Sequence, residues 1–219
     1  MWDSTMFEML GKGIGETLYM TLFSTLLAYV IGLPLGIALV VTEKESLLPN
    51  KWVNSILNII VNITRSVPFL ILLVFIQPFT RAIVGTAIGS TATIVPLVVA
   101  AAPFIGRMVE SSIKELDKGV IEAALSMGAS PLQIIWKVML PETKPSLWVG
   151  AAISSTTILG YSAMAGFTSG GGLGDIAIRY GYNRYQTDVM FVTVVLLVVI
   201  VQVLQGIGMK IASKQDKRK

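Results

Sequence analysis

The residue types that carry most enzyme chemistry are scarce in this chain. It contains no His and no Cys, which excludes thiol catalysis, disulfides and imidazole metal sites. Its carboxylates, among them Asp117, Glu122, Asp175 and Asp188, lie in polar connections rather than deep in the apolar stretches. General acid–base catalysis needs a positioned acid and base, and no such pair is visible. We therefore expect a chain without catalytic residues or a metal site.

Two glycine-rich stretches invite comparison with phosphate-binding loops. Gly170–Gly174 lacks the Lys-Ser/Thr ending of such a loop, and it follows a long apolar stretch instead of a strand. Gly11-Lys12-Gly13 fails for the same reasons. We expect no nucleotide site and no cofactor in this chain, so that any ATP and Mg²⁺ would be bound by a partner.

The most informative spacing lies in residues 122–141, between long apolar stretches. Val120 to Met127 predicts a short helix, which Gly128 can end cheaply in the left-handed conformation. Ser130 suits the N-cap of a second helix and Pro131 its first position. That helix is predicted to run towards Leu140 and to stop at Pro141. A helix, a glycine corner and a helix can project one short helix out of a membrane bundle.

This segment resembles the cytoplasmic loop of ABC importer permeases, whose pattern is matched by Glu122, Ala123, Ala124, Gly128, Val138, Leu140 and Pro141. The family usually has Ile where Val138 stands. In that family the first helix is a coupling helix that docks into a groove on the ATPase subunit. The resemblance implies that Glu122, Ala123 and Ala124 make the docking contact and that Gly128 sets the angle of the helix. The alternative is an ordinary helical hairpin between two membrane spans.

The composition is typical of a polytopic membrane protein. Of 219 residues, 53% are hydrophobic and only 14% are charged, which is unusual for a soluble domain. The net charge of +4 indicates basic cytoplasmic loops rather than a nucleic-acid partner. The first sixteen residues lack the positive region of a cleavable signal peptide.

The apolar stretches predict an all-α fold with five transmembrane helices in a single domain, residues 1–219 with its core at 13–209. A bilayer core of about 30 Å needs roughly 20 apolar residues per helix. The expected spans are 17–42, 57–80, 82–106, 147–170 and 189–209, with a polar loop at 107–144 that contains the motif.

The basic residues predict the orientation of these spans. Twelve of the 17 Lys and Arg residues lie in 43–51, 107–144 and 210–219, whereas four lie in the connections on the other side and Arg65 lies in the second span. The positive-inside rule then places the motif loop and the C-terminus in the cytoplasm and the N-terminus outside.

Arg65 and Pro68 interrupt the second apolar stretch. An arginine in a membrane span is expected near its end or facing the bundle interior, and Pro68 is expected to kink the helix. Residues 65–69, Arg-Ser-Val-Pro-Phe, resemble a stretch of amino-acid importer permeases. Two interpretations of Arg65 stay open: a brace for the inner gate or a dimer contact, or an anchor that snorkels to the interface.

The fourth apolar stretch is rich in small and hydroxyl residues. One interpretation is close helix packing. The other is a transport pathway, in which a polar solute meets Tyr161 and Ser162 and Met164 is a mobile plug; further hydroxyls come from Ser154, Ser155, Thr156 and Thr157. Beyond it, Tyr180, Tyr182 and Tyr185 form either an aromatic interface belt or part of a surface for an external binding protein.

Gly160 to Met164, followed by Gly171-Gly-Leu-Gly174 and Tyr180-Gly-Tyr182, resembles the methionine importer permeases in particular. The resemblance implies the type I ABC importer fold, a homodimer in the bacterial plasma membrane, two cytoplasmic ATPase subunits and an external methionine-binding lipoprotein. The expected function is therefore the permease subunit of an ATP-driven methionine importer. The alternatives are an importer for another amino acid or a quaternary amine, and a membrane scaffold that transports nothing.

Overall fold

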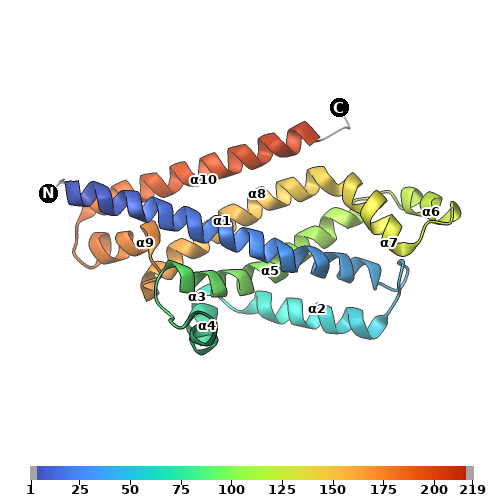
Figure 1. Ribbon diagram of the computed structural model, residues 1–219, viewed down its shortest axis with the longest axis horizontal. Coiled ribbons are helices and arrows are strands. Elements are labelled where there is room, and N and C mark those ends of the chain that lie inside the picture. The colour runs from blue at the N-terminus through green and yellow to red at the C-terminus, as the bar shows by residue number, and fades with distance from the viewer. Residues whose placement is uncertain (1–3, 216–219) are drawn as a thin grey trace.

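The computed structural model describes residues 4–215, which are almost entirely helical and contain no strand. The four longest helices lie roughly along the long axis of the molecule (Figure 1). They are α1 (Ser4–Val41), α5 (Ser90–Lys114), α8 (Leu140–Met164) and α10 (Thr187–Gln215). Shorter helices connect them: α2 (Lys51–Ser66), α3 (Phe69–Phe75), α4 (Gln77–Val84), α6 (Lys118–Ser126), α7 (Pro131–Ile134) and α9 (Gly172–Ile176).

Helices α1 and α5 form the centre of the bundle, and glycines let their backbones touch. A Cβ atom on Gly32 would lie 2.8 Å from the carbonyl oxygen of Ala102, and one on Gly36 would lie 2.5 Å from that of Gly106. Both separations are shorter than real side chains allow. The Gly32-x-x-x-Gly36 spacing therefore brings α1 against α5 as small residues do in membrane proteins, and Pro34 is accommodated inside the helix.

The second expected span, 57–80, is not one helix. Helix α2 ends at Ser66, and α3 begins at Phe69 after a bend of 101°. Val67 has φ −82° and ψ 124°, the extended conformation that a residue before proline prefers. Pro68 thus produces a corner rather than the expected kink. Helix α4 then ends at Val84 and is capped by Gly85, whose φ is +83°, and α5 begins at Ser90 instead of residue 82.

Three helices in the described part of the chain, α1, α5 and α10, are long and apolar enough to cross a membrane, and the bent pair α2–α3 would make a fourth. The expected count of five is thus not confirmed by length and composition. Helix α8 has 25 residues but is not among the helices that are apolar enough by this criterion.

The ends of the molecule differ in what they carry. Helices α6 and α7 lie at the end towards which the C-terminal end of α10 points, and α9 lies at the opposite end with the start of α1 (Figure 1). The larger buried cluster joins α1, α5 and α8 and extends to Ala124 and Ile134 in the projecting loop. A smaller cluster, which includes Leu10, Leu173 and Val189, holds α9 and α10 to the start of α1.

Candidate functional site

The loop motif forms a helix, a glycine corner and a second helix, as its sequence predicts. The Asp117 side chain caps α6 by accepting a hydrogen bond from the Gly119 N–H (2.7 Å). Gly128 has φ +79°. Its N–H donates to the carbonyl of Leu125 (2.9 Å), and the next N–H donates to that of Ala124 (3.1 Å). This pair of bonds is a Schellman motif, which favours glycine at the left-handed position.

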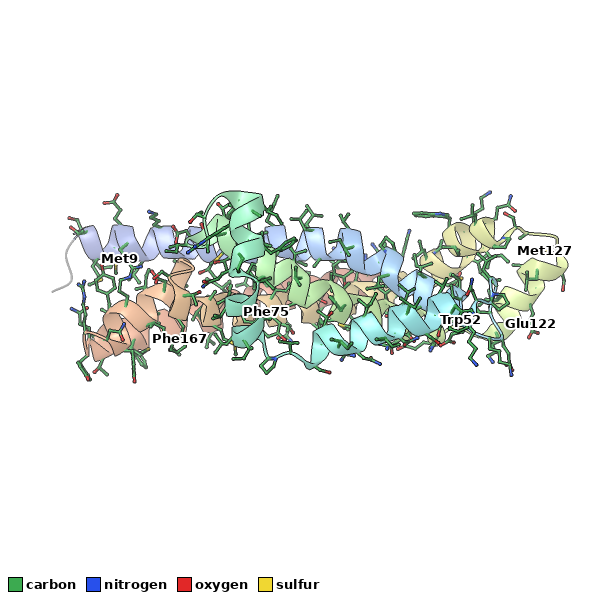
Figure 2. All side chains as sticks on the ribbon, turned by 90° about the horizontal axis from the view of Figure 1, so that it is seen from below. Met9, Trp52, Phe75, Glu122, Met127 and Phe167 are labelled. Carbon is green, nitrogen blue, oxygen red and sulfur yellow. The ribbon has the colours of Figure 1, made fainter. Side chains whose placement is uncertain are left out.

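The two faces of α6 have different surroundings. Glu122, Ala123 and Met127 are exposed, with Met127 81% accessible, and Figure 2 shows Glu122 and Met127 at the far end of the molecule. Ala124 is only 4% exposed and belongs to the main buried cluster. Ala124 therefore lies on the packed side of α6, away from the exposed face that the predicted docking contact needs. Leu125 extends the exposed face.

The second helix begins as predicted but does not end as predicted. Ser130 and Gln133 form a capping box, in which the Gln133 N–H donates to the Ser130 hydroxyl and the Ser130 N–H donates to the Gln133 side chain. Pro131 occupies the first turn of α7.

The expected stop at Pro141 is wrong. A π-helical turn, Ile135–Met139, follows α7, and the Leu140 N–H bonds the carbonyl of Ile135, five residues earlier. Pro141 then lies in the first turn of α8, where the missing N–H of proline is tolerated. Leu140 is buried. The projecting loop therefore continues into α8 through this helical turn.

The pathway candidates on α8 divide into packed and accessible residues. Ser162 is buried and donates to the carbonyl of Leu159 (2.8 Å). Ser154 and Ser155 are also buried, and they donate to carbonyls of their own helix. Thr156 and Thr157, which are half-buried, both donate to the carbonyl of Ile153. The hydroxyl protons are thus already used, which favours the packing interpretation for these residues.

Tyr161 and Met164 remain accessible on α8. The Tyr161 ring stacks on Phe69 with centroids 4.6 Å apart and planes 4° apart. Met164 is 44% exposed. At the α2–α3 corner, next to Phe69 in the chain, Arg65 and Pro68 are exposed, and among the described residues Arg65 has no hydrogen-bond or ion-pair partner. Both interpretations of Arg65 are compatible with this position.

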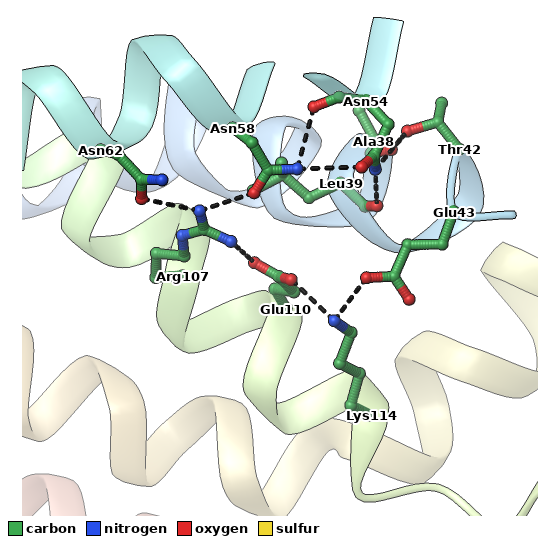
Figure 3. A network of polar contacts seen from close by, with 10 residues as sticks. All are labelled: Ala38, Leu39, Thr42, Glu43, Asn54, Asn58, Asn62, Arg107, Glu110 and Lys114. Atoms are coloured by element: carbon green, nitrogen blue, oxygen red, sulfur yellow. Dashed lines mark hydrogen bonds and ion pairs between the residues drawn. The ribbon is translucent and has the colours of Figure 1, made fainter. Parts of the chain in front are cut away.

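A polar network at the loop end of the bundle was not predicted (Figure 3). Arg107 donates to Glu110 (2.7 Å), to the Asn58 side chain (2.6 Å) and to the Asn62 side chain (2.9 Å). Lys114 pairs with the other Glu110 oxygen (2.9 Å) and with Glu43. The network ties α5 to α2 and to the loop after α1.

The network continues on α2 through a second asparagine. Asn54 accepts a hydrogen bond from Asn58 and donates to the carbonyl of Leu39 and to the Thr42 hydroxyl (Figure 3). Asn54, Asn58 and Asn62 recur every four residues, which places them on one face of α2. The sequence therefore contains a signal from which this network could have been predicted: the spacing of the three asparagines, together with Arg107, Glu110 and Lys114 on one face of α5.

The opposite end of the molecule is held by the start of α1. The Glu16 carboxylate accepts the Gly172 N–H (2.7 Å), and the Thr17 hydroxyl accepts the Leu173 N–H (2.9 Å). These contacts fix the first turn of α9.

The tyrosine cluster predicted beyond the fourth stretch lies at this end as well. Tyr182 and Tyr185 are 65% and 88% exposed, while the Arg184 guanidinium lies 4.5 Å from the centre of the Tyr180 ring. The exposure is compatible with either interpretation of the cluster.

The sequence profile of the binding-protein-dependent transport system inner membrane components matches residues 30–213. The chain belongs to this family. Among relatives of this permease family, the probable D-methionine transport system permease protein MetI of Vibrio cholerae is 49% identical over 217 residues, covering 99% of this chain and 96% of the relative. The methionine import system permease protein MetP of Bacillus subtilis is 51% identical over 203 residues, covering 93% and 91%.

Solved structures agree with this membership. A chain from a structure of inward facing conformations of the MetNI methionine ABC transporter superposes with a TM-score of 0.97 at 47% identity, covering 99% of this chain and 100% of that one. A chain of an amino acid ABC transporter, at 20% identity, has a TM-score of 0.73 and covers 97% and 95%, which shows the shared fold alone. The fold is thus that of the type I ABC importer permeases, as the resemblance implied.

Proposed function

We propose that this chain is the permease subunit that forms the pathway for methionine in an ATP-driven importer. The observation that supports methionine as the substrate is sequence identity. About half of the residues are identical, over nearly the full length, to those of permeases named for methionine transport. The stretch Gly160 to Met164 lies within the matched region. Both enantiomers belong to the proposal, because D-methionine is named for one relative and methionine without stereochemistry for the other.

The proposed assembly is a homodimer with two cytoplasmic ATPase subunits and an external methionine-binding lipoprotein, in a bacterial plasma membrane. In each subunit the five crossings are α1, the α2–α4 segment, α5, α8 and α10, with the α6 end in the cytoplasm. The charge asymmetry supports this orientation, as does the direction of α10, whose C-terminal end points towards the end of the molecule that carries α6 (Figure 1). This subunit binds no nucleotide or cofactor; ATP and Mg²⁺ belong to the ATPase.

Helix α6 is the proposed docking element. Its exposed face offers Glu122, Ala123, Leu125 and Met127 to a groove on the ATPase, and Gly128 fixes the angle at which it projects. ATP-driven closure of the ATPase pair brings the two α6 helices together, and the bundle opens outwards to accept the solute; hydrolysis resets it. The nucleotide must favour the outward-facing state for this to occur.

Displacement of α6 passes to the rest of the bundle in two directions. Towards the N-terminus, α6 joins α5, and the Arg107–Glu110–Lys114 network links α5 to α2. Towards the C-terminus, α7 and the π-helical turn continue into α8. Because α2 and α8 both lead to the stacked Phe69 and Tyr161, we assign this pair to the region that rearranges during transport.

Reconstitution tests the function. The chain, its ATPase and the binding protein are placed in proteoliposomes, and uptake of radiolabelled L- and D-methionine is followed with and without ATP. We expect ATP-dependent uptake that unlabelled methionine suppresses and that other amino acids or quaternary amines leave unchanged. Suppression by another amino acid and not by methionine would contradict the assigned substrate. A membrane scaffold would show no uptake of any of these solutes.

A further inference from the structure

A cavity of about 500 Å³ opens between α2, α5, α8 and α10, at the end of the bundle that carries α6. Its charged lining residues are Arg65, Arg107 and Glu115, and its apolar wall includes Phe104, Val149 and Ile153. Ligand pockets typically measure about 300–1,000 Å³ and combine an apolar wall with a few polar groups. The cavity has this size and composition, and it lies apart from the docking face of α6.

The charges in the cavity are not equally available. Arg107 is occupied, because its guanidinium donates to Glu110, Asn58 and Asn62. Arg65 has no such partner among residues 4–215. Glu115 uses one carboxylate oxygen to accept a hydrogen bond from Ser146 (2.9 Å), and its other oxygen makes no contact of this kind within the same described residues. The cavity therefore presents one available cation and one available anion.

We propose that this cavity is a transit site for an α-amino acid zwitterion on the cytoplasmic side of the pathway. Arg65 binds the carboxylate, because a guanidinium matches the two carboxylate oxygens. Glu115 binds the ammonium group, and the side chain of the amino acid lies against Phe104, Val149 and Ile153. The proposal rests on the proposed function and adds to it the place where the amino acid pauses before release.

A zwitterion explains the lining better than a simple anion does. A phosphate or a lipid headgroup phosphate would use Arg65 alone and leave the carboxylate of Glu115, in the same cavity lining, without a cationic partner. A transit site must also release its solute, so that binding has to be weak. Exposure of the Arg65 side chain fits weak binding, because water competes for its donors.

Cysteine protection tests the site directly, since the natural chain has no Cys. Ser111, an exposed residue in the cavity lining, is replaced in a Ser111→Cys variant. The full permease–ATPase complex is studied in nanodiscs without nucleotide or binding protein, and the rate of maleimide labelling is measured against the concentration of methionine. We expect methionine to slow the labelling. Lys44→Cys, in the exposed loop after α1, is the matched control and should label at a constant rate.

The charged residues are then tested in the Ser111→Cys background. Arg65→Gln and Glu115→Gln should each raise the half-protecting methionine concentration by about tenfold or more, and Arg65→Lys should have a smaller effect. Methioninol, which has an alcohol in place of the carboxylate, should protect weakly, and to the same extent whether or not the Arg65→Gln change is present. Co-elution with the ATPase shows that each variant is assembled.

Two results would overturn the site. One is labelling that methionine never slows, and the other is protection that Arg65→Gln leaves unchanged. Uptake in proteoliposomes separates this failure from failure of the proposed function. Methionine uptake without protection would contradict the transit site alone, whereas absence of methionine uptake would contradict both the transit site and the proposed function.

Discussion

The aromatic rings of Phe69 and Tyr161 lie nearly parallel, with their centroids 4.6 Å apart and their planes 4° apart. Phe69 is the first residue of α3 after the 101° bend, and Tyr161 lies near the end of α8. The pair thus joins the α2–α3 corner to the α8 segment. Phe69 is 7% exposed, so the contact is part of the main buried cluster.

Loss of the Phe69 ring should weaken this connection. We expect Phe69→Ala to lower the stability of the purified complex by about 3 kcal/mol, because it removes a buried aromatic side chain. Tyr161→Phe keeps the stack and should cost less than about 1 kcal/mol. The midpoint of thermal unfolding in detergent measures both. Equal midpoints for Phe69→Ala and the natural chain would contradict the structural role of the stack.

Gly128 should be sensitive to any side chain. Its φ of +79° costs a non-glycine residue about 1–2 kcal/mol, although no atom would contact an added Cβ. Gly128→Ala should therefore reduce stability of the loop and weaken coupling of ATP hydrolysis to uptake. Gly206→Ala is the matched control: Gly206 lies in α10 with equal space around it and no positive φ. The ratio of uptake to hydrolysis in proteoliposomes distinguishes the two variants, and an equal ratio would count against Gly128 as the residue that sets the angle.

Ala123 and Ala124 should respond differently to arginine. Ala123→Arg places the charge on the exposed face of α6, so that the permease remains folded but binds the ATPase less tightly. Ala124→Arg forces a charge into a position that is 4% exposed, and it should destabilise the loop itself. Co-purification with the ATPase and the unfolding midpoint of the permease are measured together. Normal ATPase binding by Ala123→Arg would count against α6 as the docking element.

Glu110 should be the most sensitive member of the polar network. Its side chain is 9% exposed and pairs with both Arg107 and Lys114. Glu110→Gln leaves these cations without their shared partner, and we expect a loss of about 3 kcal/mol. Glu43→Gln removes a pair whose side chains are 41–44% exposed and should cost less than about 1 kcal/mol. Denaturant unfolding of the purified permease measures both, and similar losses for the two variants would contradict a buried role for Glu110.

Local signals in the sequence predict the projecting loop correctly. The glycine corner at Gly128 and the cap at Ser130 depend on residues within a few positions of one another, so propensity decides them. The stop expected at Pro141 is wrong because a π-helical turn shifts the hydrogen bonds before it, and nothing local distinguishes that turn from a helix end. At Pro68 a kink is expected from the sequence, but its size depends on what α3 packs against.

The remaining features depend on partners far apart in the chain. Arg107 and Asn58 are 49 positions apart, and Lys114 and Glu43 are 71 apart. The sequence shows a polar face on each helix but does not say that the two faces meet. Tertiary packing likewise decides that Ala124, and not Ala123, is buried, because an alanine suits either an exposed or a buried position.

Contact between the backbones of α1 and α5 limits how this permease can change shape. Gly32 and Gly36 lie directly against carbonyl groups of α5. If α1 slid along α5, larger neighbouring side chains would have to enter a space that accommodates only the hydrogen atom of a glycine. The two helices are consequently expected to travel as one rigid body. Rearrangement between access states would then be concentrated where α8, α10 and the α2–α3 corner meet that body.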